Sequence, residues 1–146
     1  MPAPRLARAS DLPQIEALVE AAYAKYIPRI GMRPIPMDDD YAARVERSEA
    51  WVLGDVDALI VLVPDEEWLL VDNVAVRPGL QRQGLGRRVL AFAEEEAARR
   101  GYRELRLYTN EKMTENRALY ARLGYEELGR ETITGRHAVW MRKRLS

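Results

Sequence analysis

Residues 74–90 constrain the fold more than any other part of the chain. They read VAVRPGLQRQGLGRRVL, in which an apolar strand end meets a Pro-Gly break, a glycine-containing turn and the start of an amphipathic helix. The first N–H groups of a helix have no intrahelical partner, and the helix dipole adds partial positive charge there. Gly84 and Gly86 have no side chain to keep a ligand away from the backbone. We therefore expect a phosphate or pyrophosphate site at this turn, with added charge from Arg82 and Arg87.

Two common nucleotide-binding motifs do not fit this turn. A P-loop needs Lys followed by Ser or Thr after its last Gly, and the chain has Arg87 and Arg88 there. A Rossmann fingerprint needs a third Gly or Ala three residues after the second Gly, and the chain has Val89 there. The acidic residue that should follow about 20 residues later is not evident. The turn is therefore neither an ATP-type nor an NAD-type site.

Composition narrows the class of protein. At 146 residues the chain can bury a sizeable core, and we expect a single domain over residues 1–146. Its 23 basic and 23 acidic residues balance, which argues against a nucleic-acid partner held by bulk charge. The chain has no Cys and one His, so we expect no disulfide, no Cys nucleophile and no metal site. The lack of Cys fits a reducing cytoplasm, and we expect a cytoplasmic protein. No apolar run approaches the roughly 20 residues of a membrane span.

Hydrophobic periodicity predicts alternating strands and helices. Strands are predicted at residues 5–9, 50–53, 57–63, 68–76, 105–108, 126–133 and 137–142, and helices at 11–26, 41–45, 84–100 and 114–123. Prolines at 28, 34 and 36 predict a loop over residues 27–37. The strand 68–76 is apolar nearly throughout, which is typical of a central strand covered on both faces.

The predicted order is β-α-α-β-β-β-α-β-α-β-β, an α/β fold with a mixed sheet and helices on both faces. This order resembles that of the Gcn5-related N-acetyltransferase (GNAT) superfamily, and so does the strand–Pro–Gln-x-x-Gly-x-Gly–helix pattern of residues 74–90. The resemblance covers essentially the whole chain and is densest over residues 71–125. It implies an enzyme that transfers an acetyl group from acetyl-CoA to a primary amine of a small molecule or protein. The alternative is a GNAT-fold module that binds CoA as a sensor or scaffold, without transfer.

The resemblance also implies where the cofactor binds. In the family, the loop amides hold the pyrophosphate, and a bulged strand end offers free backbone groups to the acetyl carbonyl and the pantetheine arm. Many members have an Asn seven residues before their catalytic Tyr, and here that residue is Met113, so Asn116 is considered as a substitute. The predicted cofactor contacts are Val74, Ala75, Val76, Arg82, Gln83, Gly84, Leu85, Gly86, Arg87 and Asn116. The competing interpretation is an ordinary apolar strand end followed by a solvated glycine turn.

Residues 119–125, LYARLGY, resemble the family segment that carries the general acid. This resemblance predicts that Tyr120 protonates the departing CoA thiolate. A thiol has a pKa near 8.5 and a Tyr near 10, so the transfer costs only about 2 kcal/mol. The alternative is a packed helix Tyr whose hydroxyl meets solvent. Since no Cys is present to form an acyl-enzyme, we expect the amine to attack directly.

An alkylammonium must lose a proton before it attacks, so a general base is expected. Asp72 is the first candidate, because strand alternation predicts that its side chain points to the same sheet face as Val74 and Val76. The other candidates are Glu66, Glu67 and Glu111, and a surface or capping role is open for each.

The acceptor cannot be identified from the sequence. Residues around the Pro-rich stretch combine aromatic, apolar and charged groups, which suit a small ligand. From these we select Tyr26, Arg33 and Met37 as candidate acceptor contacts, with core packing or helix capping as the alternative. The terminal strands offer a surface for a homodimer, which nothing in the sequence requires.

Overall fold

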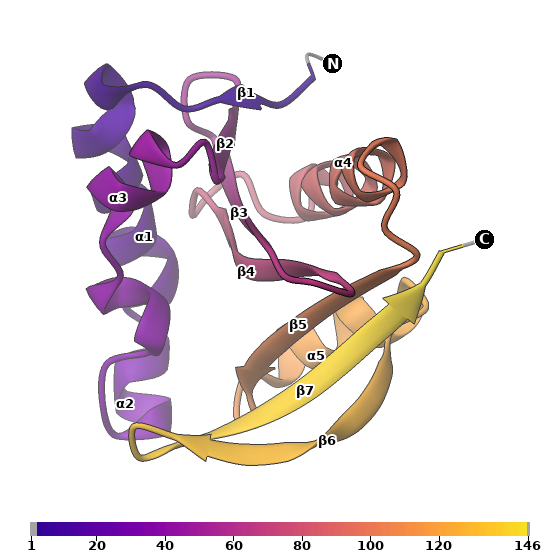
Figure 1. The fold of residues 1–146 in the computed structure, drawn as a ribbon. Coiled ribbons are helices and arrows are strands. Elements are labelled where there is room, and N and C mark those ends of the chain that lie inside the picture. Colours follow the sequence, from indigo (N-terminus) through magenta and orange to yellow (C-terminus); the bar gives the residue numbers. More distant parts are fainter. Residues whose placement is uncertain (1–2, 146) are drawn as a thin grey trace.

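The computed structural model describes residues 3–145 (Figure 1). Its strands are β1 (Arg5–Leu6), β2 (Ala50–Leu53), β3 (Ala58–Pro64), β4 (Leu69–Val76), β5 (Glu104–Asn110), β6 (Glu126–Ile133) and β7 (Arg136–Arg144). Its α-helices are α1 (Leu12–Tyr23), α2 (Tyr26–Ile30), α3 (Tyr41–Glu46), α4 (Leu85–Arg99) and α5 (Thr114–Arg122). Two 3₁₀ turns, η1 (Ala9–Asp11) and η2 (Ile35–Asp38), flank α1 and α2. Within residues 3–145, no helix is both long enough and apolar enough to cross a bilayer.

The strands form one mixed sheet in the order β1-β2-β3-β4-β5-β7-β6. All neighbours pair antiparallel except β4 and β5, which are parallel. One face packs against α4 and α5, and the other packs against α1 and α3. Figure 1 shows α1, α2 and α3 together at one side of the sheet, with α5 behind β5 and β7. The predicted mixed α/β sheet with helices on both faces, in the GNAT order, is confirmed.

A bulge in β4 changes which way its side chains point. Val61 pairs with Asn73 while Leu62 pairs with Val71, so Asp72 is the extra residue. A bulge shifts the alternation of side chains along its strand. Val74 packs against the core on the α4 side, whereas Asp72 contacts Arg44 of α3 on the opposite face. The prediction that Asp72 shares a face with Val74 and Val76 is therefore wrong, and the bulge lies before Val74 instead of at the strand end.

The N-terminal third differs from the prediction in detail. Helix α1 ends at Tyr23, and the residues expected to form a loop contain α2 and η2. Pro28 is tolerated because it lies in the first turn of α2, where a backbone N–H needs no intrahelical partner. Gly31 then ends α2 with φ +88°. Strand β1 is shorter than predicted because the Asp11 carboxylate accepts the Arg8 N–H at 2.8 Å and closes the chain into η1.

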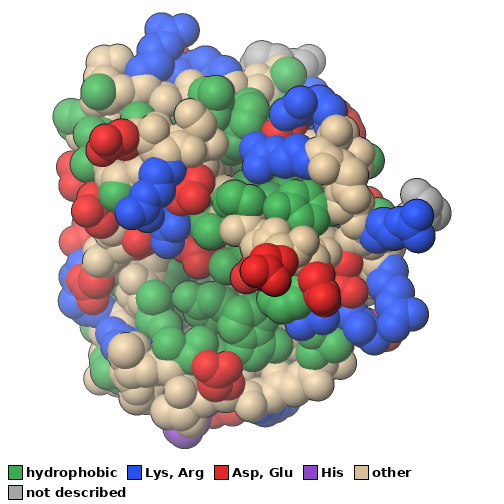
Figure 2. Space-filling view, in the orientation of Figure 1, with side chains coloured by type: hydrophobic (Ala, Val, Ile, Leu, Met, Phe, Trp, Pro, Cys, Tyr) green, Lys and Arg blue, Asp and Glu red, His purple; other side chains and the backbone are tan. Residues whose placement is uncertain are grey.

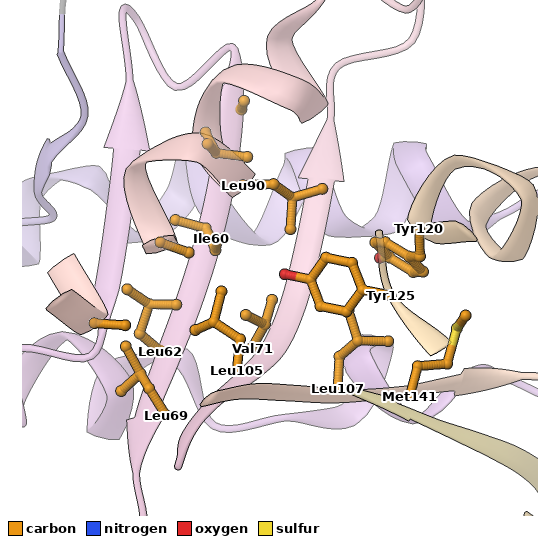
Figure 3. Close-up of a cluster of buried hydrophobic side chains, with 14 of the residues drawn as sticks. Ile60, Leu62, Leu69, Val71, Leu90, Leu105, Leu107, Tyr120, Tyr125 and Met141 are labelled. Carbon is orange, nitrogen blue, oxygen red and sulfur yellow. The ribbon is translucent and has the colours of Figure 1, made fainter. Parts of the chain in front are cut away.

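The larger core cluster lies between the sheet and α4 and α5. Figure 3 shows Leu90 of α4 facing Ile60, Val71 and Leu105 of the sheet, with Tyr120 and Tyr125 beside Leu107 and Met141. The Tyr120 and Tyr125 rings lie 5.7 Å apart, centroid to centroid. Packing against Tyr125, Leu107 and Met141 thus fixes the position of the Tyr120 ring.

Replacing Leu107 tests this packing. Leu107 on β5 is 1% exposed, and Leu107→Ala is expected to lower the free energy of unfolding by about 2–5 kcal/mol. Leu128 on β6 is 39% exposed, and Leu128→Ala, the matched control, is expected to change it by less than about 0.5 kcal/mol. Urea denaturation followed by circular dichroism measures both, and similar losses in the two variants would contradict the packing described.

Candidate functional site

Strand β4 has an open backbone edge at its C-terminal end. Its parallel pairing with β5 stops at Val71, which pairs with Leu107. The Arg77 N–H bonds to the Asp57 carbonyl at 2.9 Å, on the β3 side. Backbone groups alternate along an antiparallel strand, so Ala75 also faces β3 while Val74 and Val76 face away from it. Their N–H and C=O groups thus point into the space where β5 has diverged.

A groove of about 670 Å³ runs from this open edge to the glycine turn. We call it the inner groove. It is lined by Ala22, Tyr23, Lys25, Tyr26, Val74, Ala75, Val76, Gln81, Arg82, Gly84, Leu85, Gly86, Arg87, Glu115, Asn116, Leu119, Tyr120 and Arg122. Every predicted cofactor contact except Gln83 is among them. Gln83 is exposed, and Gln81 takes its place on the wall.

The phosphate end of the inner groove is the N-terminus of α4. Arg82 and Gly84 have φ of 71° and 79°, left-handed conformations that turn successive backbone N–H groups toward one concave site. Gly84 is the N-cap, so the first N–H groups of α4 have no intrahelical acceptor. The lining carries four basic side chains and one acidic side chain, Glu115. This excess of positive charge and free N–H groups suits a pyrophosphate.

Glu115 is already paired with a basic side chain. Its carboxylate lies 2.6 Å from Arg29, and this bond lowers the pKa of Glu115 to about 2. Tyr26 also donates a hydrogen bond to Glu115 at 3.3 Å. Glu115 therefore stays ionised, but its charge is offset at the side of the groove.

Tyr120 lies where the inner groove reaches the open edge of β4. Its side chain is 7% exposed, and among the described residues its hydroxyl has no hydrogen-bond partner. Burial raises the pKa of the Tyr120 phenol above its ordinary value of 10.0, and the Tyr26 phenol raises it further. The hydroxyl is therefore protonated at neutral pH and available as a donor. Asn116 lines the same part of the groove, one helical turn before Tyr120.

A narrow apolar throat leads from this point to the other side of the sheet edge. It has room for about 50 Å³ and shares Tyr23, Val74, Asn116 and Tyr120 with the inner groove. Its remaining lining is Pro34, Ile35, Pro36, Val71, Asp72, Asn73, Tyr108, Thr109, Asn110, Met113, Arg136 and Ala138. The throat opens into an outer pocket of about 330 Å³, which is lined by Ile35, Pro36, Asp38, Asp39, Arg44, Asp72, Tyr108, Thr134 and Arg136.

Asp72 lies between the throat and the outer pocket. Its carboxylate is 3.3 Å from Arg44, which also contacts Asp39 and Glu49, each at 2.9 Å. Burial raises the pKa of the Asp72 carboxyl above its ordinary value of 3.8. Arg44 lowers this pKa in part, and the two other carboxylates raise it. Asp72 is thus a stronger base than an ordinary carboxylate, in a cluster with more negative than positive charge.

A buried chain of hydrogen bonds joins the throat to its outer wall. The Tyr23 hydroxyl donates to the Asn73 side chain and lies 3.0 Å from the Val74 carbonyl. The Asn73 amide donates to the Tyr41 hydroxyl at 2.9 Å, and that hydroxyl donates to the Pro36 carbonyl at 2.5 Å. These hydrogen bonds link the open edge of β4 to η2, which lines the outer pocket.

The predicted acceptor contacts take other positions. Tyr26 lines the inner groove instead of the outer pocket. Arg33 bonds to Asp38 and Glu20 and supports the Pro-rich segment from outside. Met37 packs against the core under α1 and α3. None of the three is among the residues that line the throat or the outer pocket.

Sequence reasoning missed several residues that form the site. They are Arg44, Asn73, Tyr108 and Arg136, together with Ile35 and Pro36 of η2. One signal was present for Asn73, which is a polar residue inside an otherwise apolar strand. Arg136 gave no local signal, because its contact is with the carbonyl of Arg33, 103 residues earlier.

Figure 2 shows the face that includes the outer part of the site. Hydrophobic side chains gather over β5 and β7, with acidic and basic side chains around them. These strands place Tyr108 beside Trp140, with ring centroids 4.9 Å apart. Burial, followed by repulsion from Asp72 and Asp39, raises the pKa of Tyr108 to about 12. Tyr108 therefore forms a neutral aromatic wall of the outer pocket.

Among the described residues, no group of three or more acidic or His side chains is arranged to hold a metal ion.

Comparisons with known proteins agree with this geometry. The sequence profile of the family described as "Acetyltransferase (GNAT) domain" matches residues 46–127. No curated protein sequence matches the chain. The structure is similar to that of PaiA N-acetyltransferase from Thermoplasma acidophilum in complex with coenzyme A, with a TM-score of 0.79, 16% identity and coverage of 97% of each chain.

Two further solved structures extend the comparison. The ribosomal-protein-S18-alanine N-acetyltransferase from Escherichia coli has a TM-score of 0.72 and 23% identity, over 100% of this chain and 95% of that one. A nourseothricin acetyltransferase has a TM-score of 0.60 and 22% identity, over 66% of this chain. This chain spans 64% of the length of that protein.

Proposed function

Because the chain belongs to the GNAT family of acetyltransferases, it is an N-acetyltransferase that uses acetyl-CoA, and we propose that it acetylates a primary amine by direct attack. The observation that carries this proposal is the meeting of two cavities. The inner groove and the throat join at Val74 and Tyr120, so a donor from one side and an acceptor from the other meet at these two residues. The chain has no Cys that could form an acyl-enzyme.

The inner groove would bind acetyl-CoA along its length. The N–H groups at the start of α4 would hold the pyrophosphate, with Arg82 and Arg87 adding charge. The free backbone groups of Val76 would pair with the pantetheine arm as an added strand does, and the Val74 N–H would face the acetyl carbonyl. Asn116 lies close enough to line both cavities and would contact the same arm.

Three groups of this chain would assist the transfer. When bound, acetyl-CoA supplies a thioester carbonyl that the amine attacks, so that a C–N bond forms and the C–S bond breaks. The Val74 N–H would stabilise the negative charge that develops on the carbonyl oxygen. Tyr120 would donate its phenolic proton to the leaving sulfur. Burial raises the pKa of a thiol as well as that of a phenol, so this proton transfer remains feasible in the throat.

Asp72 would accept the proton that the ammonium loses. It lies on the acceptor side, and burial raises its pKa, which brings its basicity closer to that of the amine. The other candidate bases lie elsewhere. Glu66 and Glu67 are exposed at the turn between β3 and β4, and Glu111 pairs with Arg130 at 3.1 Å.

The Tyr120 assignment predicts a loss of turnover without a loss of cofactor binding. Tyr120→Phe is expected to lower kcat by about 10²-fold, since it removes only the acidic proton. The dissociation constant of acetyl-CoA should stay within about twofold. Stopped-flow detection of the released thiol and calorimetry measure the two quantities.

Tyr125→Phe is the matched control for that experiment. The Tyr125 ring packs against that of Tyr120 at a tilt of 59°, and its buried hydroxyl has no hydrogen-bond partner among the described residues. Its removal should leave kcat unchanged. Equal effects of the two substitutions, or no effect of Tyr120→Phe, would contradict the assignment of the acid.

The Asp72 assignment predicts a pH-dependent defect. At neutral pH the acceptor is almost entirely protonated, so Asp72→Asn should lower kcat/KM for the acceptor by at least about tenfold. The defect should shrink as the pH rises toward 10, because free amine then replaces the need for a base. Rate measurements from pH 6 to 10 test this, with the exposed Glu66→Gln as the control. A defect of the same size at every pH would show that Asp72 is not the base.

A further inference from the structure

The shape of the acceptor side limits which amines reach the reacting position. The throat has room for about 50 Å³, against about 330 Å³ in the outer pocket. A water molecule needs at least about 10–15 Å³ measured in this way, so the throat has room for only about four groups of that size. An unbranched methylene chain passes through such a space, whereas a carbon with a second substituent needs lateral room.

The walls of the throat are fixed by hydrogen bonds. The Tyr41 hydroxyl donates to the Pro36 carbonyl at 2.5 Å, and Asn73 anchors Tyr41 from the sheet. Ile35 and Pro36 are therefore tied to the same network that contacts Val74. A wall held in this way widens only at the cost of buried hydrogen bonds.

Hydrogen bonds from Arg136 fix the side of the outer pocket that the turn between β6 and β7 forms. Arg136 of β7 donates two hydrogen bonds to the Arg33 carbonyl, at 2.6 and 3.1 Å. It also donates to the Thr134 carbonyl at 2.8 Å. The turn between β6 and β7 is thereby joined to the Pro-rich segment across the pocket. These bonds hold Thr134 and Arg136 in place, and both residues line the outer pocket.

The outer pocket favours a cation. It is lined by three carboxylates, those of Asp38, Asp39 and Asp72, and by two cationic side chains, Arg44 and Arg136. The Arg136 guanidinium is bonded to backbone carbonyls, so the lining keeps an excess of one negative charge. The aromatic ring of Tyr108 lines the same pocket. A cluster with excess negative charge attracts an ammonium group.

From the small volume of the throat, its fixed walls and the excess of carboxylates in the outer pocket, we infer that the acceptor is a small primary alkylamine whose amino group ends an unbranched chain. This inference rests on the proposed acetyl transfer and narrows its acceptor class. It excludes the α-amines of amino acids and of peptide N-termini other than glycine, because their amine-bearing carbon is branched.

Two isomeric amines test the inference directly. n-Butylamine and sec-butylamine have the same composition and differ only in branching at the amine-bearing carbon. The values of kcat/KM with acetyl-CoA are divided by the uncatalysed rate constants of the same amines, which removes their intrinsic reactivity. We expect a corrected preference of about tenfold or more for n-butylamine. A corrected ratio near one, a preference for sec-butylamine, or faster turnover of alanine amide would overturn the inference.

Widening the throat should relax this preference. Ile35 lines both the throat and the outer pocket, and Ile35→Ala is expected to reduce the corrected ratio at least threefold. Ile30 of α2 is half-buried like Ile35 and lies outside these linings, so Ile30→Ala should keep the ratio. An unchanged ratio in Ile35→Ala would overturn the role of the throat.

Thermal shift with acetyl-CoA separates this inference from the function on which it depends. Stabilisation by acetyl-CoA without turnover of any of the three amines would overturn the acceptor class and leave cofactor binding intact. No stabilisation by acetyl-CoA would overturn the proposed transfer, and the acceptor inference with it.

Discussion

Strand β4 loses its neighbour on one side after Val71, and the site depends on that loss. Up to Val71, β4 is paired on both edges, with β3 and with β5. Beyond it, Val74 and Val76 direct their backbone groups away from β3 into an unpaired edge. Unpaired backbone groups in a sheet are costly unless something binds them. A ligand that pairs like a strand satisfies them, which explains why both cavities meet at this edge.

The protein keeps this edge open by fixing the elements around it. Tyr23 from α1 and Tyr41 from α3 both reach Asn73 in the middle of the sheet. Tyr23, Tyr41 and Asn73 are all buried, so the hydrogen bonds between them are made away from solvent and resist rearrangement. On the opposite face, Tyr120 packs against the core that α4 and α5 form with the sheet. The inner groove therefore lies between the two cores, with Tyr23 on one wall and Tyr120 on the other.

Local patterns were sufficient to predict much of this architecture. The order of strands and helices, the glycine turn and the helix that follows it depend on short-range periodicity and on turn residues. The expected cofactor contacts, Gln83 apart, line one groove. All of these except Asn116 of α5 come from two adjoining segments, residues 74–76 and 82–87, which is why local patterns could group them. Helix α2 was missed because Pro28 was interpreted as a helix breaker, although it lies in a first turn.

Local sequence patterns could not predict how the acceptor side is built. The bulge at Asp72 reverses the alternation of β4, and nothing in the apolar run of residues 68–76 marks where a bulge falls. The outer pocket is built from η2, β5 and the turn before β7, which meet only in the folded chain. Tyr26 was expected there because of its neighbours in sequence, yet the break after α1 turns it into the inner groove.

Amide hydrogen exchange at three adjacent residues of β4 tests the open edge most directly. In the free protein, the Val74 and Val76 N–H groups should exchange faster than that of Ala75, which faces β3. Acetyl-CoA should slow the exchange of Val74 and Val76 by at least about tenfold and leave Ala75 unchanged. Slow exchange of all three in the free protein, or protection on binding that falls on Ala75 alone, would contradict the account of β4 as an edge that pairs with the cofactor.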